Sequence, residues 1–95
     1  MTVTHRMISK QDEYFLAIAE AGSISQAAQR LYLSQPALSN SLKRLEEELG
    51  TQLLSRDTYP LQLTQAGRLY FRFVRGEQER EQRPRQDLAQ LEREP

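Results

Sequence analysis

The stretch SQPALSNSLKRLEEELG, from Ser34 to Gly50, decides the fold. At about 100° of rotation per residue, its leucines form one apolar stripe on a helix, made of Leu38, Leu42, Leu45 and Leu49. The other side of the same helix carries mostly small, polar or charged residues, namely Pro36, Ser39, Asn40, Lys43 and Glu47. The apolar stripe predicts packing against a core, and Gly50 is well placed to end the helix.

The polar side of this helix has the properties needed to enter the major groove of DNA. Short donors and acceptors can reach base edges, a cation can meet a phosphate, and no bulky side chain obstructs the approach. The glutamates at positions 46–48 would repel DNA, and they lie at the far end of the helix. We therefore expect residues 35–43 to read DNA and the second half to be structural, with its glutamates toward solvent.

Length and composition fit one small domain with a tail. The chain has 95 residues, with 13 Lys+Arg and 13 Asp+Glu, so any basic patch must be local. The absence of cysteine excludes thiolate metal sites and fits a cytoplasmic location. No apolar run reaches the ~20 residues of a membrane span, and residues 1–10 lack the apolar region of a signal peptide. With no nucleophile–base arrangement, and with His5 lacking any partner pattern, we expect no enzyme activity, cofactor or metal.

Two shorter helices are predicted before the opening stretch. Ser9 is a suitable N-cap for the first helix, and Gly22 can end it in a left-handed conformation. Ser23 and Gln26 form a capping box that begins the second helix, which continues to Leu31.

The turn over residues 32–34 contains no glycine, and we expect Leu33 to be its buried pivot. Two starting points for the third helix remain open, Ser34 and Gln35. Ser34 has the side chain of an N-cap, whereas Pro36 fits the first turn but disfavours a helical residue immediately before it.

After Gly50 the apolar spacing changes. The segments 53–56 and 61–63 predict two short strands, and residues 57–60 form the turn between them. A hairpin directly after a groove-reading helix is a wing.

A fourth helix is predicted after the hairpin, with Thr64 as its cap and an apolar pattern that continues to Val74. Gly76 and Pro84 weaken its continuation. The charged stretch 77–95 is compatible with solvated helix and with disorder.

These elements together predict a mainly α winged helix-turn-helix fold, a three-helix core with a short β-hairpin wing followed by a long linker helix. Residues 14–67 resemble the N-terminal DNA-binding domain of LysR-type transcriptional regulators. The matching residues are Tyr14-Phe15, Gly22-Ser23, Ala27-Ala28, Leu31, Ser34-Gln35-Pro36-Ala37, Ser39, Leu45-Glu46, Leu49-Gly50, Leu53-Leu54, Arg56, Leu63-Thr64 and Ala66-Gly67. Each piece is weakly specific, but their combined order and spacing is strongly specific.

The resemblance implies a bacterial, sequence-specific transcription regulator that binds double-stranded DNA at dyad sites. It implies a DNA-binding domain over 7–67, a helix-turn-helix motif at about 24–43, and a linker helix with charged tail over 68–95 that mediates homodimerisation. An effector-binding domain normally follows in this family, and we expect it to be absent from this chain. We therefore expect no small-molecule effector here, and expect a fragment, an engineered piece or a naturally truncated regulator.

Ten residues are predicted to contact DNA on the basis of this resemblance: Ser23, Ser25, Ser34, Gln35, Pro36, Ala37, Ser39, Asn40, Lys43 and Arg56. Gln35 and Asn40 are expected at base edges, and Lys43 at a phosphate. Simpler interpretations exist, such as plain capping for the serines of the second helix and a surface ion pair for Arg56. The dimer interface is predicted at Leu69, Tyr70, Phe73 and Val74.

Three features depart from the family pattern. Asp12 stands where the family usually has leucine, so either Ile8 replaces that packing or the first helix starts later. The wing tip has fewer cations than usual, and the stretch after Val74 lacks an apolar seam. The alternative function is a truncated protein-interaction module that pairs with other family members without binding DNA strongly itself.

Overall fold

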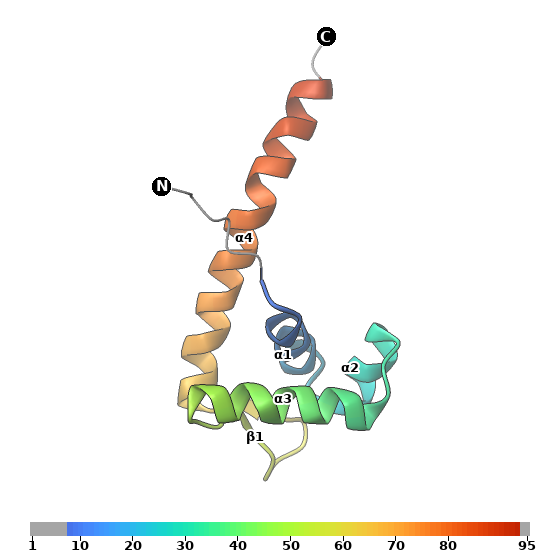
Figure 1. Ribbon diagram of the computed structural model, residues 1–95, viewed down its shortest axis with the longest axis vertical. Coiled ribbons are helices and arrows are strands. Elements are labelled where there is room, and N and C mark those ends of the chain that lie inside the picture. The colour runs from blue at the N-terminus through green and yellow to red at the C-terminus, as the bar shows by residue number, and fades with distance from the viewer. Residues whose placement is uncertain (1–7, 94–95) are drawn as a thin grey trace.

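The computed structural model describes the backbone of residues 8–93 and the side chains of residues 8–80. The described chain forms the helices α1 (Lys10–Ala21), α2 (Ile24–Leu31) and α3 (Gln35–Leu49), the strands β1 (Leu54–Ser55) and β2 (Gln62–Leu63), and the helix α4 (Gln65–Arg93). Helix α1 lies at the centre, α3 crosses one end of the molecule, and α4 extends away from that end (Figure 1). The predicted winged helix-turn-helix fold is confirmed.

The first three helices begin and end where the sequence predicts. The hydroxyl oxygens of Ser9, Ser23 and Ser34 each accept the backbone N–H of the residue three positions later, at 3.1–3.2 Å. Gly22 and Gly50 follow α1 and α3 with φ angles of 66° and 72°. Glycine adopts this left-handed conformation without a Cβ clash, which explains the abrupt ends of both helices.

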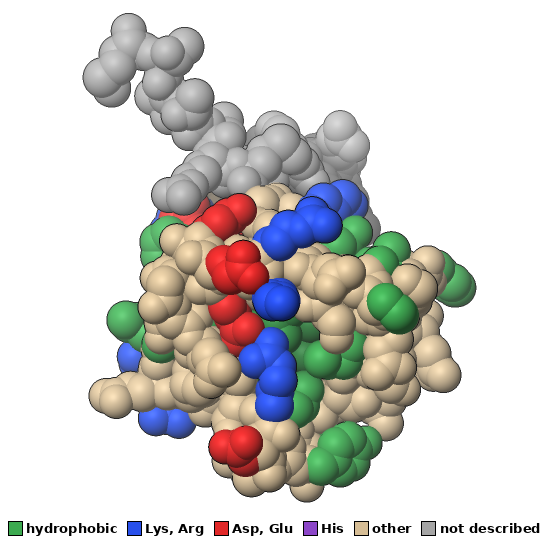
Figure 2. Space-filling model, turned by 60° about the horizontal axis from the view of Figure 1, so that its bottom comes forward, with side chains coloured by type: hydrophobic (Ala, Val, Ile, Leu, Met, Phe, Trp, Pro, Cys, Tyr) green, Lys and Arg blue, Asp and Glu red, His purple; other side chains and the backbone are tan. Residues whose placement is uncertain are grey.

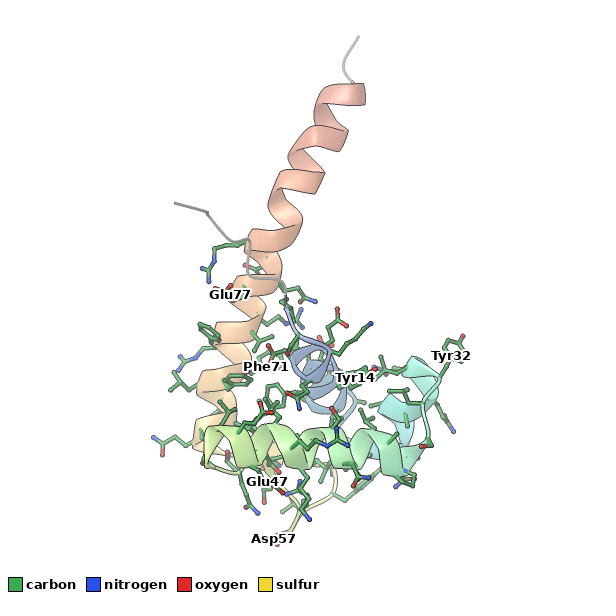
Figure 3. The ribbon with its side chains drawn as sticks, viewed as in Figure 1. Tyr14, Tyr32, Glu47, Asp57, Phe71 and Glu77 are labelled. Carbon is green, nitrogen blue, oxygen red and sulfur yellow. The ribbon has the colours of Figure 1, made fainter. Side chains whose placement is uncertain are left out.

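The turn between α2 and α3 differs in detail from the prediction. Tyr32 takes the left-handed conformation (φ 56°) that glycine often supplies, and its side chain projects into solvent (Figure 3). Leu33 packs against the core but stays partly exposed. Ser34 is the N-cap and Gln35 the first helical residue, so the bias of Pro36 against a helical predecessor is overcome.

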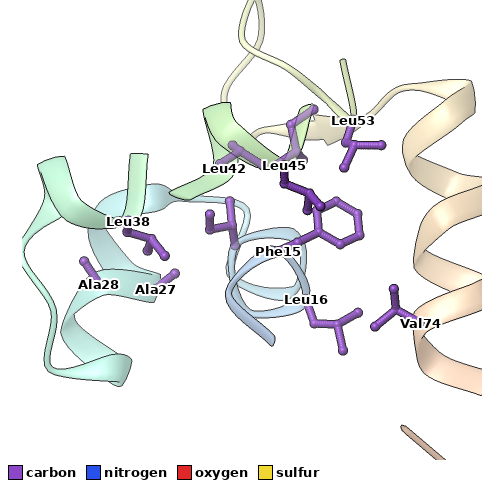
Figure 4. Close-up of a cluster of buried hydrophobic side chains, with 11 residues drawn as sticks. Phe15, Leu16, Ala27, Ala28, Leu38, Leu42, Leu45, Leu53 and Val74 are labelled. Atoms are coloured by element: carbon purple, nitrogen blue, oxygen red, sulfur yellow. The ribbon is translucent and has the colours of Figure 1, made fainter. Parts of the chain in front are cut away.

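The core lies where α1 packs against α2, α3 and α4, with Ala27 and Ala28 as the buried residues of α2. Phe15 of α1 is fully buried and lies between Leu45 of α3, Leu53 and Val74 of α4 (Figure 4). The predicted leucine stripe is confirmed at Leu38, Leu42 and Leu45, which are buried. The prediction is wrong for Leu49, which is 42% exposed because it lies in the last turn of α3, beyond the core.

A two-stranded antiparallel hairpin follows α3. Leu54 pairs with Leu63 and Ser55 with Gln62, so the strands are shorter than predicted. We call residues 53–63 the wing.

Helix α4 begins in close contact with the wing. The hydroxyl of Thr64 accepts the N–H of Gly67 at 2.9 Å and donates to the carbonyl of Gln52 at 2.7 Å. A Cβ on Gly67 would lie 1.9 Å from the carbonyl oxygen of Leu53, so only glycine permits this approach.

Helix α4 continues through Gly76 and Pro84 to Arg93. Of the two interpretations left open for residues 77–95, the helical one therefore applies as far as residue 93. Residues 1–7, including His5, lie outside the described part of the chain. No described helix combines the length and hydropathy that a membrane crossing requires.

Polar contacts join α1 to α4 at the position where the family usually has leucine. The carboxylate of Asp12 accepts a hydrogen bond from the hydroxyl of Tyr70, and Ile8 packs against the core nearby in sequence. Arg75 pairs with Glu20 and lies 5.3 Å from the ring centre of Phe71. Helix α1 starts where predicted. The position of Asp12 therefore lies inside the helix, and its side chain makes a hydrogen bond to α4 where leucine was expected to pack.

Two glycines of α4 provide a matched stability test. The Gly67→Ala variant should lower the free energy of unfolding by about 3 kcal/mol, because its methyl group would overlap the carbonyl of Leu53. The Gly76→Ala variant should raise it by about 0.5–1 kcal/mol, since its methyl group would have space and alanine favours a helix. Urea denaturation followed by circular dichroism measures both. A Gly67→Ala protein as stable as the parent would contradict the close approach.

Candidate nucleic-acid interface

The first half of α3 presents its predicted polar face to solvent. Gln35, Pro36, Ala37, Asn40 and Lys43 are exposed, and Ser39 is half-buried. The buried leucines of the same helix face α1 and α2 and so fix which side chains face outward. The face predicted to read DNA is therefore accessible.

An open groove of about 670 Å³ separates α3 from the start of the wing. It is lined by Ser39, Asn40, Lys43, Glu46, Glu47, Gly50, Thr51, Gln52 and Arg56. The structure thus brings four predicted contact residues together, from α3 and from the wing. Sequence reasoning missed Thr51 and Gln52, whose position became apparent only once the chain reversal after Gly50 was known.

The charge on this face is mixed. Figure 2 views the molecule with this end brought forward, and shows basic and acidic side chains next to one another near the centre. Glu47 lies on the same side of α3 as the wing tip, which carries Asp57 (Figure 3). The groove therefore presents the cations Lys43 and Arg56 with the anions Glu46 and Glu47 beside them.

The expectation that Glu46 points to solvent is wrong. Its side chain is buried, and one carboxylate oxygen accepts the N–H groups of Leu53 at 2.7 Å and Leu54 at 3.4 Å. The other oxygen lies 2.8 Å from the guanidinium of Arg56. Glu46 lies four residues after Leu42 and so borders the apolar stripe, which places it under the returning chain. It satisfies wing N–H groups that burial would otherwise leave without an acceptor.

The simpler interpretation of Arg56, an ion pair with a nearby carboxylate, is confirmed, and the partner is Glu46. Its side chain is nevertheless 42% exposed and lines the groove. An arginine has five N–H donors, and one carboxylate oxygen does not use them all. The ion pair and a phosphate contact are therefore compatible.

The serines at the helix starts differ in their accessibility. Ser23 is buried, and its hydroxyl accepts the N–H of Gln26, so capping accounts for its side chain. Ser25 and Ser34 are exposed. Ser34 caps α3 with its oxygen as acceptor, which leaves its hydroxyl hydrogen free to donate.

The predicted dimer residues lie on two different faces of α4. Leu69 and Phe73 are 64% and 46% exposed. Val74 is buried in the core, and the ring of Tyr70 lies 5.6 Å from that of Phe15. The prediction is therefore wrong for Val74, and Tyr70 is mainly an internal contact. Residues four apart share a helix face. The pair Tyr70 and Val74 therefore packs inward, and the pair Leu69 and Phe73 faces outward.

A family model described as "Bacterial regulatory helix-turn-helix protein, lysR family" matches residues 9–68, more than half of the chain. The chain belongs to the LysR family. It is 47% identical over 62 residues to the "Probable cat1 operon transcriptional activator" of Acinetobacter lwoffii, covering 65% of this chain and 20% of the relative. It is 42% identical over 86 residues to the "HTH-type transcriptional regulator CrgA" of Neisseria meningitidis serogroup C (strain 8013), covering 90% of this chain and 26% of the relative.

The chain therefore spans about a quarter or less of the length of these two LysR-type relatives, which are named as transcription regulators and not as enzymes. Among solved structures it is similar to that titled "Crystal Structure of BenM_DBD/catB site 1 DNA Complex". The TM-score is 0.79 with 29% identity, over 94% of this chain and 99% of that chain. The helices and wing of this LysR-family chain thus have the arrangement of a domain solved with DNA.

The cap of α3 gives a test of how this LysR-type interface is held. The Ser34→Ala variant should lower the free energy of unfolding by about 1 kcal/mol, because the N–H of Ala37 loses its acceptor. The Ser25→Ala variant is the control, since Ser25 is exposed within the first turn of α2 and the cap there is Ser23. Thermal denaturation compares the two proteins. Equal stability of both variants would show that the Ser34 hydroxyl is not an effective cap.

Proposed function

We propose that this chain is the DNA-binding domain of a LysR-type transcription regulator and that it reads the major groove with the first turns of α3. The supporting observation is the exposed polar face of residues 35–43, placed beside the groove that leads to the wing. The DNA-bound relative of similar structure adds support. We assign residues 7–67 to the DNA-binding domain and residues 68–95 to the linker helix and tail.

The proposed contacts divide into two kinds. Gln35 and Asn40 reach base edges, and Pro36 and Ala37 provide apolar contact to a thymine methyl group or a sugar. Phosphate contacts come from the remaining exposed or partly exposed residues, Ser25, Ser34, Ser39, Lys43 and Arg56.

Selection of bound duplexes from a random pool tests the function directly. A LysR-type DNA-binding domain that binds as a dimer should enrich a dyad sequence, with half-sites about one helical turn apart or a multiple of it. Affinity for the selected site should fall steeply as salt rises, because phosphate contacts release counterions. Recovery of no enriched sequence, together with salt-insensitive binding, would contradict the proposal.

The two kinds of contact predict different mutational effects. The Asn40→Ala variant should change which sequences are preferred, at ~1–3 kcal/mol for the lost base contact. The Lys43→Ala variant should weaken all sequences alike and reduce the salt dependence. Binding to a panel of single-base variants of the selected site measures both. Identical effects across the panel would show that the assignment of the groove face is wrong.

We further propose that the chain dimerises through the outward face of α4, at Leu69 and Phe73. The Leu69→Glu variant should weaken self-association, because a charge would be buried in an apolar contact. The Gln29→Glu variant, which adds the same charge on an exposed site of α2, is the control. Sedimentation velocity of both proteins gives the monomer fraction. The same fraction in the two variants would exclude this face.

The alternative is an interaction module that pairs with other family members. The exposed apolar residues of α4 are the observation that favours it. Dimers without salt-sensitive DNA binding, measured on one sample, would select this alternative.

A further inference from the structure

We infer that Glu46 is a positioning residue for DNA binding: its buried carboxylate aims the guanidinium of Arg56 into the groove between α3 and the wing. This inference rests on the proposed function. It adds that a negatively charged residue, Glu46, supports the binding of negatively charged DNA. A negatively charged side chain on a DNA-reading helix would ordinarily be expected to oppose binding.

The two oxygens of the Glu46 carboxylate hold different parts of the wing segment. One oxygen holds the N–H groups of Leu53 and Leu54, at the point where the chain enters the wing. The other oxygen holds Arg56, two residues further along the same segment. Glu46 therefore connects α3 to the wing and orients the one cation that the wing supplies among residues 53–63.

Arg56 retains hydrogen-bond donors for DNA while it is paired with Glu46. Its guanidinium is planar and presents donors on several edges, so it can bind a carboxylate on one edge and a phosphate on another. The side chain is partly exposed and lines the same groove as Lys43 and Asn40. A DNA backbone lying in this groove would meet a guanidinium that is already held in place, and less conformational freedom would be lost on binding.

Two neighbouring glutamates of α3 have different surroundings. Glu46 is buried and paired, whereas Glu47 is exposed in the same groove. No ion pair is found for Glu47 among the described residues. Both carry the same charge from the same helix. If charge alone mattered, neutralising either residue would strengthen DNA binding. Weaker binding after neutralisation of Glu46, with stronger binding after neutralisation of Glu47, would therefore indicate that Glu46 positions Arg56.

The experiment uses Glu46→Gln and Glu47→Gln in the full chain, with affinity measured for a selected duplex by fluorescence anisotropy. Glu46→Gln keeps an oxygen acceptor for the wing N–H groups and removes the charge that holds Arg56. It should weaken binding about tenfold, the loss expected for one charge-assisted hydrogen bond. Glu47→Gln should strengthen binding, because it removes only repulsion. Stronger binding by both variants would overturn the inference.

A double-mutant cycle separates positioning from a general loss of structure. In an Arg56→Gln background, Glu46→Gln should have no further weakening effect on DNA affinity. Arg56→Gln and Glu46→Gln should each reduce the slope of log affinity against log salt by the amount that corresponds to the loss of about one phosphate contact. A further loss of affinity in the double variant, or an unchanged slope in Glu46→Gln, would mean that Glu46 acts only through stability.

The Arg56→Lys variant keeps the inference testable if Glu46→Gln fails to fold. Lysine retains the charge but lacks the planar fork that can bridge a carboxylate and a phosphate. Arg56→Lys should therefore lose most of the affinity that Arg56→Gln loses, and full retention would overturn the inference. Absence of salt-sensitive binding by the unaltered chain would instead contradict the proposed function itself.

Discussion

Burial of the leucine stripe of α3 is the constraint on which the other features depend. Leu38 lies beside Ala27 and Ala28 of α2, whereas Leu42 and Leu45 lie toward α1 (Figure 4), and this packing sets the rotation of α3 about its own axis. A slip of one residue would turn the helix by about 100° and direct Asn40 and Lys43 away from the outer face. Core packing and the proposed DNA recognition are therefore not separable in this domain, because the same helix rotation would serve both.

The features that sequence reasoning predicted correctly are those encoded by residues close together in the chain. A serine cap bonds to a residue three positions later, and a terminal glycine acts on the turn that it ends. The leucine stripe is likewise a local repeat. Such signals gave the helix boundaries, the order of elements and the polar face of α3, since none depends on where distant segments lie.

The features that sequence reasoning missed depend on distant segments. Within the run of three glutamates, only the path of the chain after Gly50 decides that Glu46 receives the N–H groups of Leu53 and Leu54. The position of Glu46 beside the apolar stripe was the one available signal. On α4, the pairs Leu69/Phe73 and Tyr70/Val74 have the same spacing, and only the docking of α4 on α1 shows that the second pair faces inward.

The proposed DNA binding must be reconciled with a chain of no net charge. The described ion pairs use Lys10, Arg56, Arg75 and Arg80 within the molecule, whereas none of them involves Lys43 or Arg44 of α3. Long-range attraction is therefore weak, and the few cations near the groove act at short range, where their orientation matters more than their number. A carboxylate that costs some attraction but fixes a guanidinium is favourable under these conditions. The same reasoning favours binding as a dimer, because two linked DNA-binding domains gain affinity without additional charge on either domain.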